Sequence, residues 1–116
     1  MVDYWADAGM TSYKAYTHIT RDELQAAADL AHKRGLKITG HLCSIGFSEA
    51  AALGIDNLEH GLLVDTELYS HKKPDICDFD GLPALLELSK MEASDPRIQE
   101  VIKTLVARHV AVTSTM

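Results

Sequence analysis

The chain has 116 residues, of which 47% are hydrophobic and 24% charged, proportions typical of a soluble globular domain and not of a disordered segment. The 11 Lys and Arg residues against 17 Asp and Glu residues give a formal net charge of -6 without any basic run, which argues against nucleic-acid binding. The longest apolar stretch, 50–55, is too short to span a bilayer, so we expect no membrane insertion.

A strand followed by an amphipathic helix is the first predicted unit. Residues 10–16 are rich in Thr and Tyr, which favour strands. Thr20 then begins a capping box, in which the Thr hydroxyl and the Glu23 carboxylate can bind two free amide groups at a helix start. Apolar residues recur on one helix face, and Gly35 ends the helix. We therefore expect a strand near 10–16 and a helix near 21–34.

The same order of elements repeats downstream. Each short β-like run precedes a helical pattern that ends at a glycine or begins at a proline. Residues 2–8 resemble the end of a helix, whereas 71–80, with two lysines and three aspartates, are expected to form a loop. The remaining predicted strands lie near 36–41, 55–60 and 110–115, and the remaining helices near 46–53, 82–91 and 96–108.

Strands that alternate with helices are typical of an α/β fold with a parallel sheet. Four such strands are about half of a TIM-type (β/α)8 barrel, which takes around 250 residues. The chain starts in a helix and stops on a strand, so we expect 1–116 to be a partial barrel domain. Half a barrel would expose an apolar inner face, with residues such as Leu58 and Val112 or their strand neighbours. We expect this fragment to self-associate or to pack against the remainder of the barrel.

Three residues that can carry chemistry stand at the carboxyl ends of consecutive predicted strands: Lys14, His41 and His60. Active sites of βα barrels lie on that face. Two imidazoles from neighbouring strands can bind one divalent metal ion. A lysine ammonium cannot bind a metal, but a carbamate formed from its neutral amine and carbon dioxide has two oxygens and can bridge two metal ions. Lys14 is equally compatible with a Schiff-base nucleophile or a salt-bridge partner, and each histidine alone is compatible with a structural role.

The runs TSYKAYTHITRDELQAAADLAHKRGLKITGHL and AAALGIDNLEHG resemble the amidohydrolase superfamily, in particular its imidazolonepropionase-related branch and the dipeptidase-like metal-dependent hydrolases. The resemblance implies a distorted (β/α)8 barrel, of which this chain contains strands four to seven. It also implies that Lys14 is the carboxylated lysine of the fourth strand, that His41 binds metal on the fifth strand, and that His60 does so on the sixth in the EHG motif. The run HVAVTST resembles the seventh strand.

The leading hypothesis is a metal-dependent hydrolase of amide-like bonds, such as those of a cyclic amide, an N-acyl amino acid or a dipeptide. A metal-activated hydroxide would attack the carbonyl of this small-molecule substrate. One or two divalent ions, usually zinc, would be bound by Lys14, His41 and His60. The first-strand His-x-His and the eighth-strand Asp of the family are absent from the sequence. The alternatives are a non-catalytic half-barrel and a Schiff-base enzyme that uses Lys14.

The residues beside the three candidates lie on both sides of their strands. Glu59 is expected on the opposite side of its strand from His60, away from the metal ligands. Tyr16 is expected on the side of Lys14, and Tyr13 on the side of the helices. The other histidines are expected to be solvated or structural.

The cysteines and the N-terminus bear on the cellular compartment. Cys43 and Cys77 are far apart and form no CxxC pattern, so we expect neither a disulfide framework nor a thiolate zinc site, and Cys43 is expected to be a packed small apolar residue. Asp3 and Asp7 occupy positions where a signal peptide would need basic and then apolar residues. The reducing cytoplasm is therefore the expected compartment.

Overall fold

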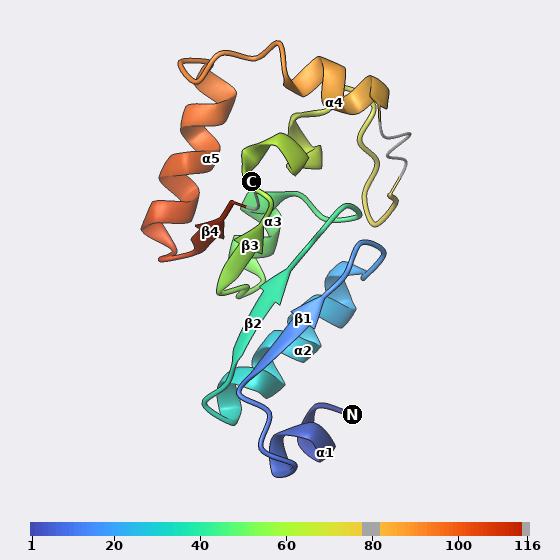
Figure 1. Ribbon diagram of the computed structural model, residues 1–116, viewed down its shortest axis with the longest axis vertical. Helices are drawn as coiled ribbons and strands as arrows, with labels where there is room; N and C mark the ends of the chain where they lie inside the picture. Colours follow the sequence, from blue (N-terminus) through green and yellow to red (C-terminus); the bar gives the residue numbers. More distant parts are fainter. Residues whose placement is uncertain (78–81, 115–116) are drawn as a thin grey trace.

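Four short strands form one parallel sheet in the computed structural model, which describes residues 1–77 and 82–114 (Figure 1). The strand order follows the sequence: β1 (Ser12–Ala15), β2 (Lys37–Gly40), β3 (Asn57–Glu59) and β4 (Ala111–Thr113). Every neighbouring pair is parallel. The predicted α/β class and the four predicted parallel strands are therefore confirmed, whereas residue 115 of the last predicted strand lies outside the described residues.

The helices also follow the predicted order. They are α1 (Val2–Asp7), α2 (Arg21–Lys33), α3 (Phe47–Ala52), α4 (Leu82–Leu88) and α5 (Pro96–Ala107). Two short 3-10 turns, Leu62–Val64 and Thr66–Leu68, follow β3. The capping box of α2 forms as predicted: the Glu23 amide donates to the Thr20 hydroxyl at 3.4 Å, and the Thr20 amide donates to the Glu23 carboxylate at 2.8 Å. Within the described ranges, no helix is long and apolar enough to cross a membrane.

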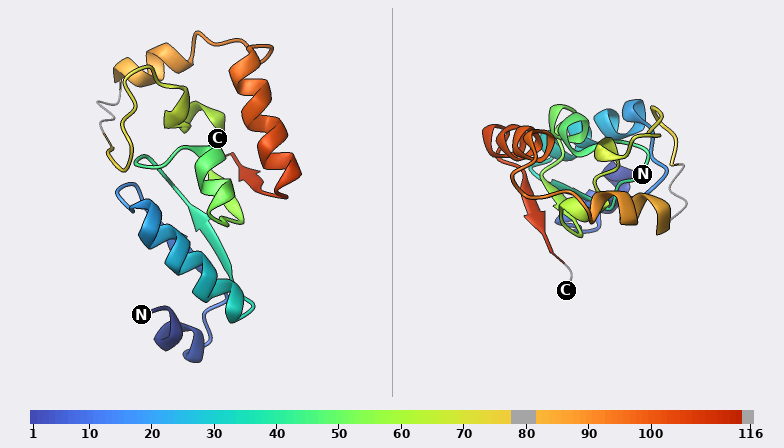
Figure 2. Two further views of the ribbon diagram at one scale, coloured as in Figure 1. Left: turned by 180° about the vertical axis from the view of Figure 1, so that it is seen from behind. Right: turned by 90° about the horizontal axis from the view of Figure 1, so that it is seen from above.

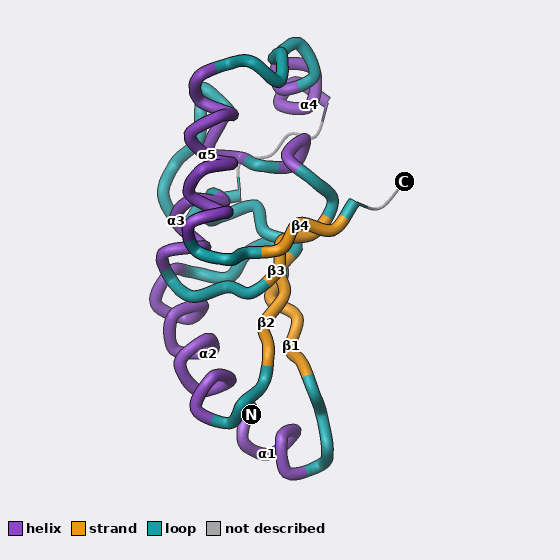
Figure 3. Tube along the Cα trace, turned by 90° about the vertical axis from the view of Figure 1, so that its left-hand side faces the viewer, coloured by secondary structure: helices purple, strands orange, loops and turns teal. Residues whose placement is uncertain are grey.

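Helices α2, α3 and α5 lie on one face of the sheet (Figure 3), and the view from behind in Figure 2 looks onto them. The hydrophobic core fills the space between these helices and the sheet. Ile38 and Leu58 point into it from the strands, whereas Leu24, Phe47 and Leu105 enter it from the helices. Because side chains alternate along a strand, the next residue on each strand faces the other side.

The face of the sheet away from the helices is polar, and the expected apolar inner face is therefore wrong. Leu58 is 0% exposed because it points toward the helices, and Val112, at 43%, occupies the partner position on the edge strand β4. The uncovered face instead carries a hydrogen-bonded series of side chains. The Thr113 hydroxyl donates to the Asn57 amide oxygen at 2.8 Å, and the Asn57 amide group donates to the Thr39 hydroxyl at 2.7 Å.

Candidate functional site

The carboxyl ends of β1, β2 and β3 bring Lys14, His41 and His60 to one edge of the sheet. Lys14 is in β1, and the two histidines directly follow β2 and β3. The His41 amide donates to the Ala15 carbonyl at 3.2 Å, which extends the pairing of β1 and β2 by one step. The imidazole rings of His41 and His60 are in edge-on contact, with 4.2 Å between their centroids.

Glu59 connects Lys14 to His60. One of its carboxylate oxygens lies 2.6 Å from Lys14 Nζ and 3.7 Å from His60 Nε2. The other oxygen accepts a hydrogen bond from the Thr39 hydroxyl at 3.0 Å. The hydrogen bond from Lys14 holds the pKa of Glu59 below its usual value against the opposing effect of burial, so this carboxylate is ionised at neutral pH.

The prediction that Glu59 points away from the other site residues is therefore wrong. The prediction assumed that the alternation of β3 continues through His60. In the structure the strand ends at Glu59, and His60 takes a left-handed backbone conformation with φ 71°. Such a residue does not continue the pleat, so Glu59 and His60 can face the same side. Gly61, the next residue, is the local signal for a turn, but a non-glycine residue uncommonly adopts a positive φ, so the alternation through His60 was the simpler expectation.

Two tyrosines lie where the alternation of β1 predicts. The Tyr16 ring contacts the His41 ring at 5.2 Å between centroids, and Lys14 Nζ lies 5.9 Å from the Tyr16 centroid. Tyr13 faces the helix side, and its hydroxyl donates to the Val2 carbonyl at 2.6 Å. Tyr16 therefore lies on the site side of β1, against the first two candidate residues.

The electrostatic environment of His41 favours its neutral form. Burial lowers the pKa of His41 most, and the nearby His60 and Lys14 lower it further, against the opposing effect of Glu59. A neutral imidazole has a lone pair on one ring nitrogen, the form that binds a metal ion or accepts a proton. His41 is therefore suited to either role near neutral pH.

The two imidazoles fit a metal such as zinc, which accepts nitrogen donors. In the part of the chain that the structure describes, no group of three or more His, Cys, Asp and Glu side chains is arranged to bind a metal ion. A third donor from these three candidates would be Lys14, and only as a carbamate. Lys14 is ion-paired with Glu59 here. A carbamate is anionic, so its formation would replace that ion pair with repulsion.

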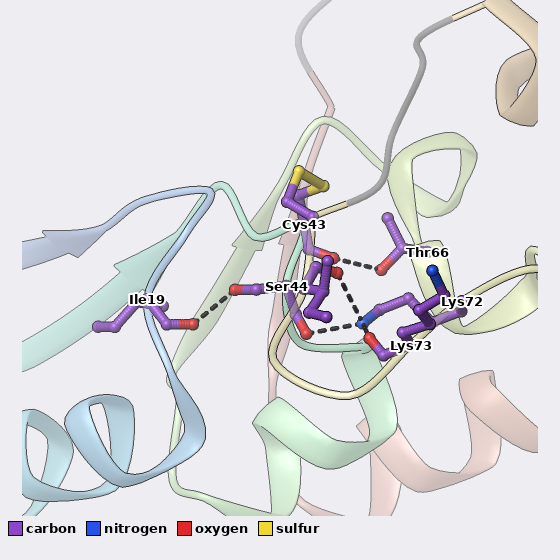
Figure 4. Close-up of a disulfide and its surroundings, with 8 residues drawn as sticks. Ile19, Cys43, Ser44, Thr66, Lys72 and Lys73 are labelled. Carbon is purple, nitrogen blue, oxygen red and sulfur yellow. Dashed lines mark hydrogen bonds between the residues drawn. A yellow bond between two sulfur atoms is a disulfide. The ribbon is translucent and has the colours of Figure 1, made fainter.

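Cys43 and Cys77 form a disulfide, with 5.1 Å between their Cα atoms, so the prediction of no disulfide is wrong (Figure 4). The segment before Cys77 folds back over the loop that follows β2. Lys72 Nζ donates to the Ser44 carbonyl at 2.7 Å. The sequence separation of 34 residues hides this proximity, because it arises from a long loop and not from a short motif.

A fully buried carboxyl group, Asp65, was also missed by sequence reasoning. Its Oδ1 accepts the Phe47 amide at 3.1 Å at the start of α3, and the Glu67 amide at 3.2 Å. Burial raises the pKa of Asp65 to about 8, and the negative charge of Glu67 adds to the shift. Asp65 holds the turn after β3 against α3 and takes no part in the contacts of Lys14, His41 and His60.

Comparisons of the chain with models of protein families, with curated proteins and with solved structures found no significant match. The chemistry open to the site is therefore indicated by its geometry. That geometry offers two imidazoles in contact, an amine beside them, and a carboxylate that bridges the amine to His60.

Proposed function

We propose that the protein is a metal-dependent hydrolase of amide-like bonds in small molecules, and that its sheet forms part of a (β/α)8 barrel. One observation carries the proposal: Lys14, His41 and His60 come from the carboxyl ends of three consecutive parallel strands and lie together there. Active sites of βα barrels are built at that end from several strands.

The difference in covering between the two faces of the sheet supports the proposed barrel. Parallel sheets are normally covered on both faces. Helices cover only one face of this sheet among the described residues (Figure 3), and the other face bears Lys14, Thr39, Asn57, Glu59 and Thr113. Closure of the sheet into a barrel would cover that face and would leave these polar side chains, already hydrogen-bonded to one another, in its interior.

Three side chains at the site would hold a metal ion. His41 and His60 would bind through ring nitrogens, and Lys14 would bind as its carbamate. A divalent ion at this position, usually zinc for such donors, polarises a carbonyl oxygen and lowers the pKa of water. Tyr16 packs edge-on against the His41 ring. Glu59 holds Lys14 at the site in the absence of carbon dioxide.

The Schiff-base alternative gains no support from the surroundings of Lys14. A lysine nucleophile of that kind needs an apolar pocket that favours the neutral amine. The Lys14 side chain is 48% exposed and its amine lies 2.6 Å from a carboxylate oxygen of Glu59. This polar, half-exposed environment is not such a pocket.

Zinc titration of the untagged protein in bicarbonate buffer, by calorimetry and elemental analysis, tests the proposal. His41→Ala and His60→Ala should each weaken binding by more than about tenfold, because loss of a ligand should cost at least as much as loss of its supporting partner. His18→Ala is the matched control, since His18 is exposed. Equal affinity of His41→Ala and His18→Ala would contradict the metal site. Formation of a free amino group from N-acyl amino acids, dipeptides and cyclic amides tests the reaction.

A further inference from the structure

A cavity of about 140 Å³ lies beside His41, at the same edge of the sheet as the candidate site. It is lined by the aliphatic residues Leu42 and Val64 and by the two cysteines of the disulfide, Cys43 and Cys77. His41 supplies an imidazole to the wall. The cavity therefore adjoins a candidate ligand residue while most of its surroundings are apolar.

The hydrogen bonds of the wall leave few groups that could donate a hydrogen bond to a polar occupant. Thr66 lines the cavity, but its hydroxyl donates to the Cys43 carbonyl at 2.8 Å, and a hydroxyl has only one hydrogen to donate. Thr17 and His41 are the other polar residues of the wall. An occupant should therefore have an apolar body and a polar end that lies at His41.

The wall is held in place by cross-links between segments far apart in the sequence (Figure 4). The disulfide joins Cys43 to Cys77. Ser44, the residue after Cys43, is held by three hydrogen bonds. Its amide donates to the Thr17 carbonyl at 2.9 Å, its hydroxyl donates to the Ile19 carbonyl at 2.5 Å, and its carbonyl accepts from Lys72 Nζ at 2.7 Å. A preformed pocket costs little ordering when a ligand binds.

The volume limits the size of the occupant. An apolar protein cavity of about 150 Å³ can hold benzene, so the 140 Å³ beside His41 suits a group of about four to six non-hydrogen atoms. Pockets for whole drug-sized ligands measure about 300–1,000 Å³. The cavity therefore matches one substituent of a ligand and not a complete large substrate.

We propose that this cavity is a binding subsite for a compact apolar group, either a branched aliphatic chain or a five-membered carbon ring, in a small molecule whose polar end lies at His41. The subsite rests on the proposed function in one respect: the polar end of the ligand is the amide that the enzyme hydrolyses. The substrate class is then an amide with such a group next to its carbonyl.

Binding of simple amides to the oxidised, metal-free protein tests the subsite without turnover. The probes are acetamide, isovaleramide, cyclopentanecarboxamide and 2-naphthamide, followed through the NMR signals of the Leu42 and Val64 methyl groups. Isovaleramide and cyclopentanecarboxamide should bind at least tenfold more tightly than acetamide, because each further buried carbon adds affinity. Binding of 2-naphthamide should be undetectable. Equal affinity for all four amides, or shifts confined to other methyl groups, would overturn the proposal.

Two substitutions at one position link the preference to the cavity. Val64→Phe should fill it and abolish isovaleramide binding, whereas Leu63→Phe, at an exposed neighbour outside the cavity wall, should leave binding unchanged. Val64→Ala enlarges the cavity and should shift the preference toward cyclohexanecarboxamide, which keeps the test decisive if Val64→Phe does not fold. An unchanged order of preference in Val64→Ala would refute the subsite.

The two proposals fail in different ways. Selective isovaleramide binding without zinc binding would support the subsite and reject the hydrolase. Zinc binding that depends on His41 and His60, together with no preference among the amides, would reject the subsite and leave the hydrolase in place.

Discussion

Lys14 of β1 and Glu59 of β3 form an ion pair across the intervening strand β2, with 2.6 Å between Nζ of Lys14 and a carboxylate oxygen of Glu59. Thr39 of β2 donates to the second carboxylate oxygen. The pair thus joins the polar face of the sheet to the candidate site, where the same carboxylate approaches His60.

Replacement of Glu59 by Gln should reduce the sensitivity of the protein to acid. The pKa of Glu59 is lowered in the folded protein, with Lys14 as the main cause. Its contribution to stability is therefore present above the unfolded pKa and lost as the pH falls through the folded one. Because Lys14 is half-exposed, the expected contribution is about 0.5–1 kcal/mol. Urea unfolding at pH 6 and pH 3 should show a smaller difference for Glu59→Gln than for the unmodified protein, and an equal difference would contradict this prediction.

Asp65→Asn should act at the opposite end of the pH range. The pKa of Asp65 is raised to about 8, so its contribution to stability is fully present below the unfolded pKa and is lost as the pH rises to about 8. Asn cannot ionise but keeps an oxygen for the Phe47 and Glu67 amides. The unmodified protein should lose up to about 1.4 kcal/mol of unfolding free energy per pH unit between pH 5 and 8. Asp65→Asn should lose less over the same range.

Asp56→Asn is the control for this test. Burial raises the pKa of Asp56, but hydrogen bonds from Lys37, the Ile38 amide and His32 lower it more, so the net shift is downward. Asp56→Asn should therefore lower the stability above the unfolded pKa of Asp56 and change its pH dependence only in the acidic range. If the two variants showed the same pH dependence, the assignment of the alkaline effect to Asp65 would be wrong.

Reduction of the Cys43–Cys77 disulfide should destabilise the protein. The bond closes a loop with a sequence separation of 34 residues, and its loss should lower the free energy of unfolding by about 3–4 kcal/mol in the chain-entropy model. Urea unfolding with and without dithiothreitol measures the effect. Cys77→Ala should match the reduced protein and should no longer respond to dithiothreitol, and a reduced protein as stable as the oxidised one would contradict the prediction.

Gly40→Ala should be destabilising because the end of β2 has no space for a side chain. A Cβ atom at this position would lie 2.6 Å from Ile55 Cδ1 and 2.9 Å from Leu42 Cγ. The expected cost is about 1–3 kcal/mol of unfolding free energy. Valine lacks the Cδ1 atom, so Ile55→Val should restore part of the stability in the double variant. Additive effects of the two substitutions, measured by thermal unfolding, would show that the contact is not the cause.

The local elements of the fold could be predicted from the sequence. The start of α2 depends on Thr20 and Glu23, three residues apart, and the capping box forms as expected. The meeting of Lys14, His41 and His60 was also predictable, because the carboxyl ends of adjacent parallel strands share one edge of the sheet and each residue lies at or next to the carboxyl end of its strand. Both inferences use only local patterns and the periodic geometry of a sheet.

Tertiary structure decided the features that depend on contacts between distant segments. The alternation around Glu59 does not indicate that His60 turns the chain, nothing near Cys43 indicates that Cys77 returns to it, and nothing near Asp65 indicates its burial against α3. Each outcome is determined by the packing of a loop against another element. Hydrophobic burial and electrostatic desolvation act on the environment that the whole chain creates, and a local sequence pattern does not contain that environment.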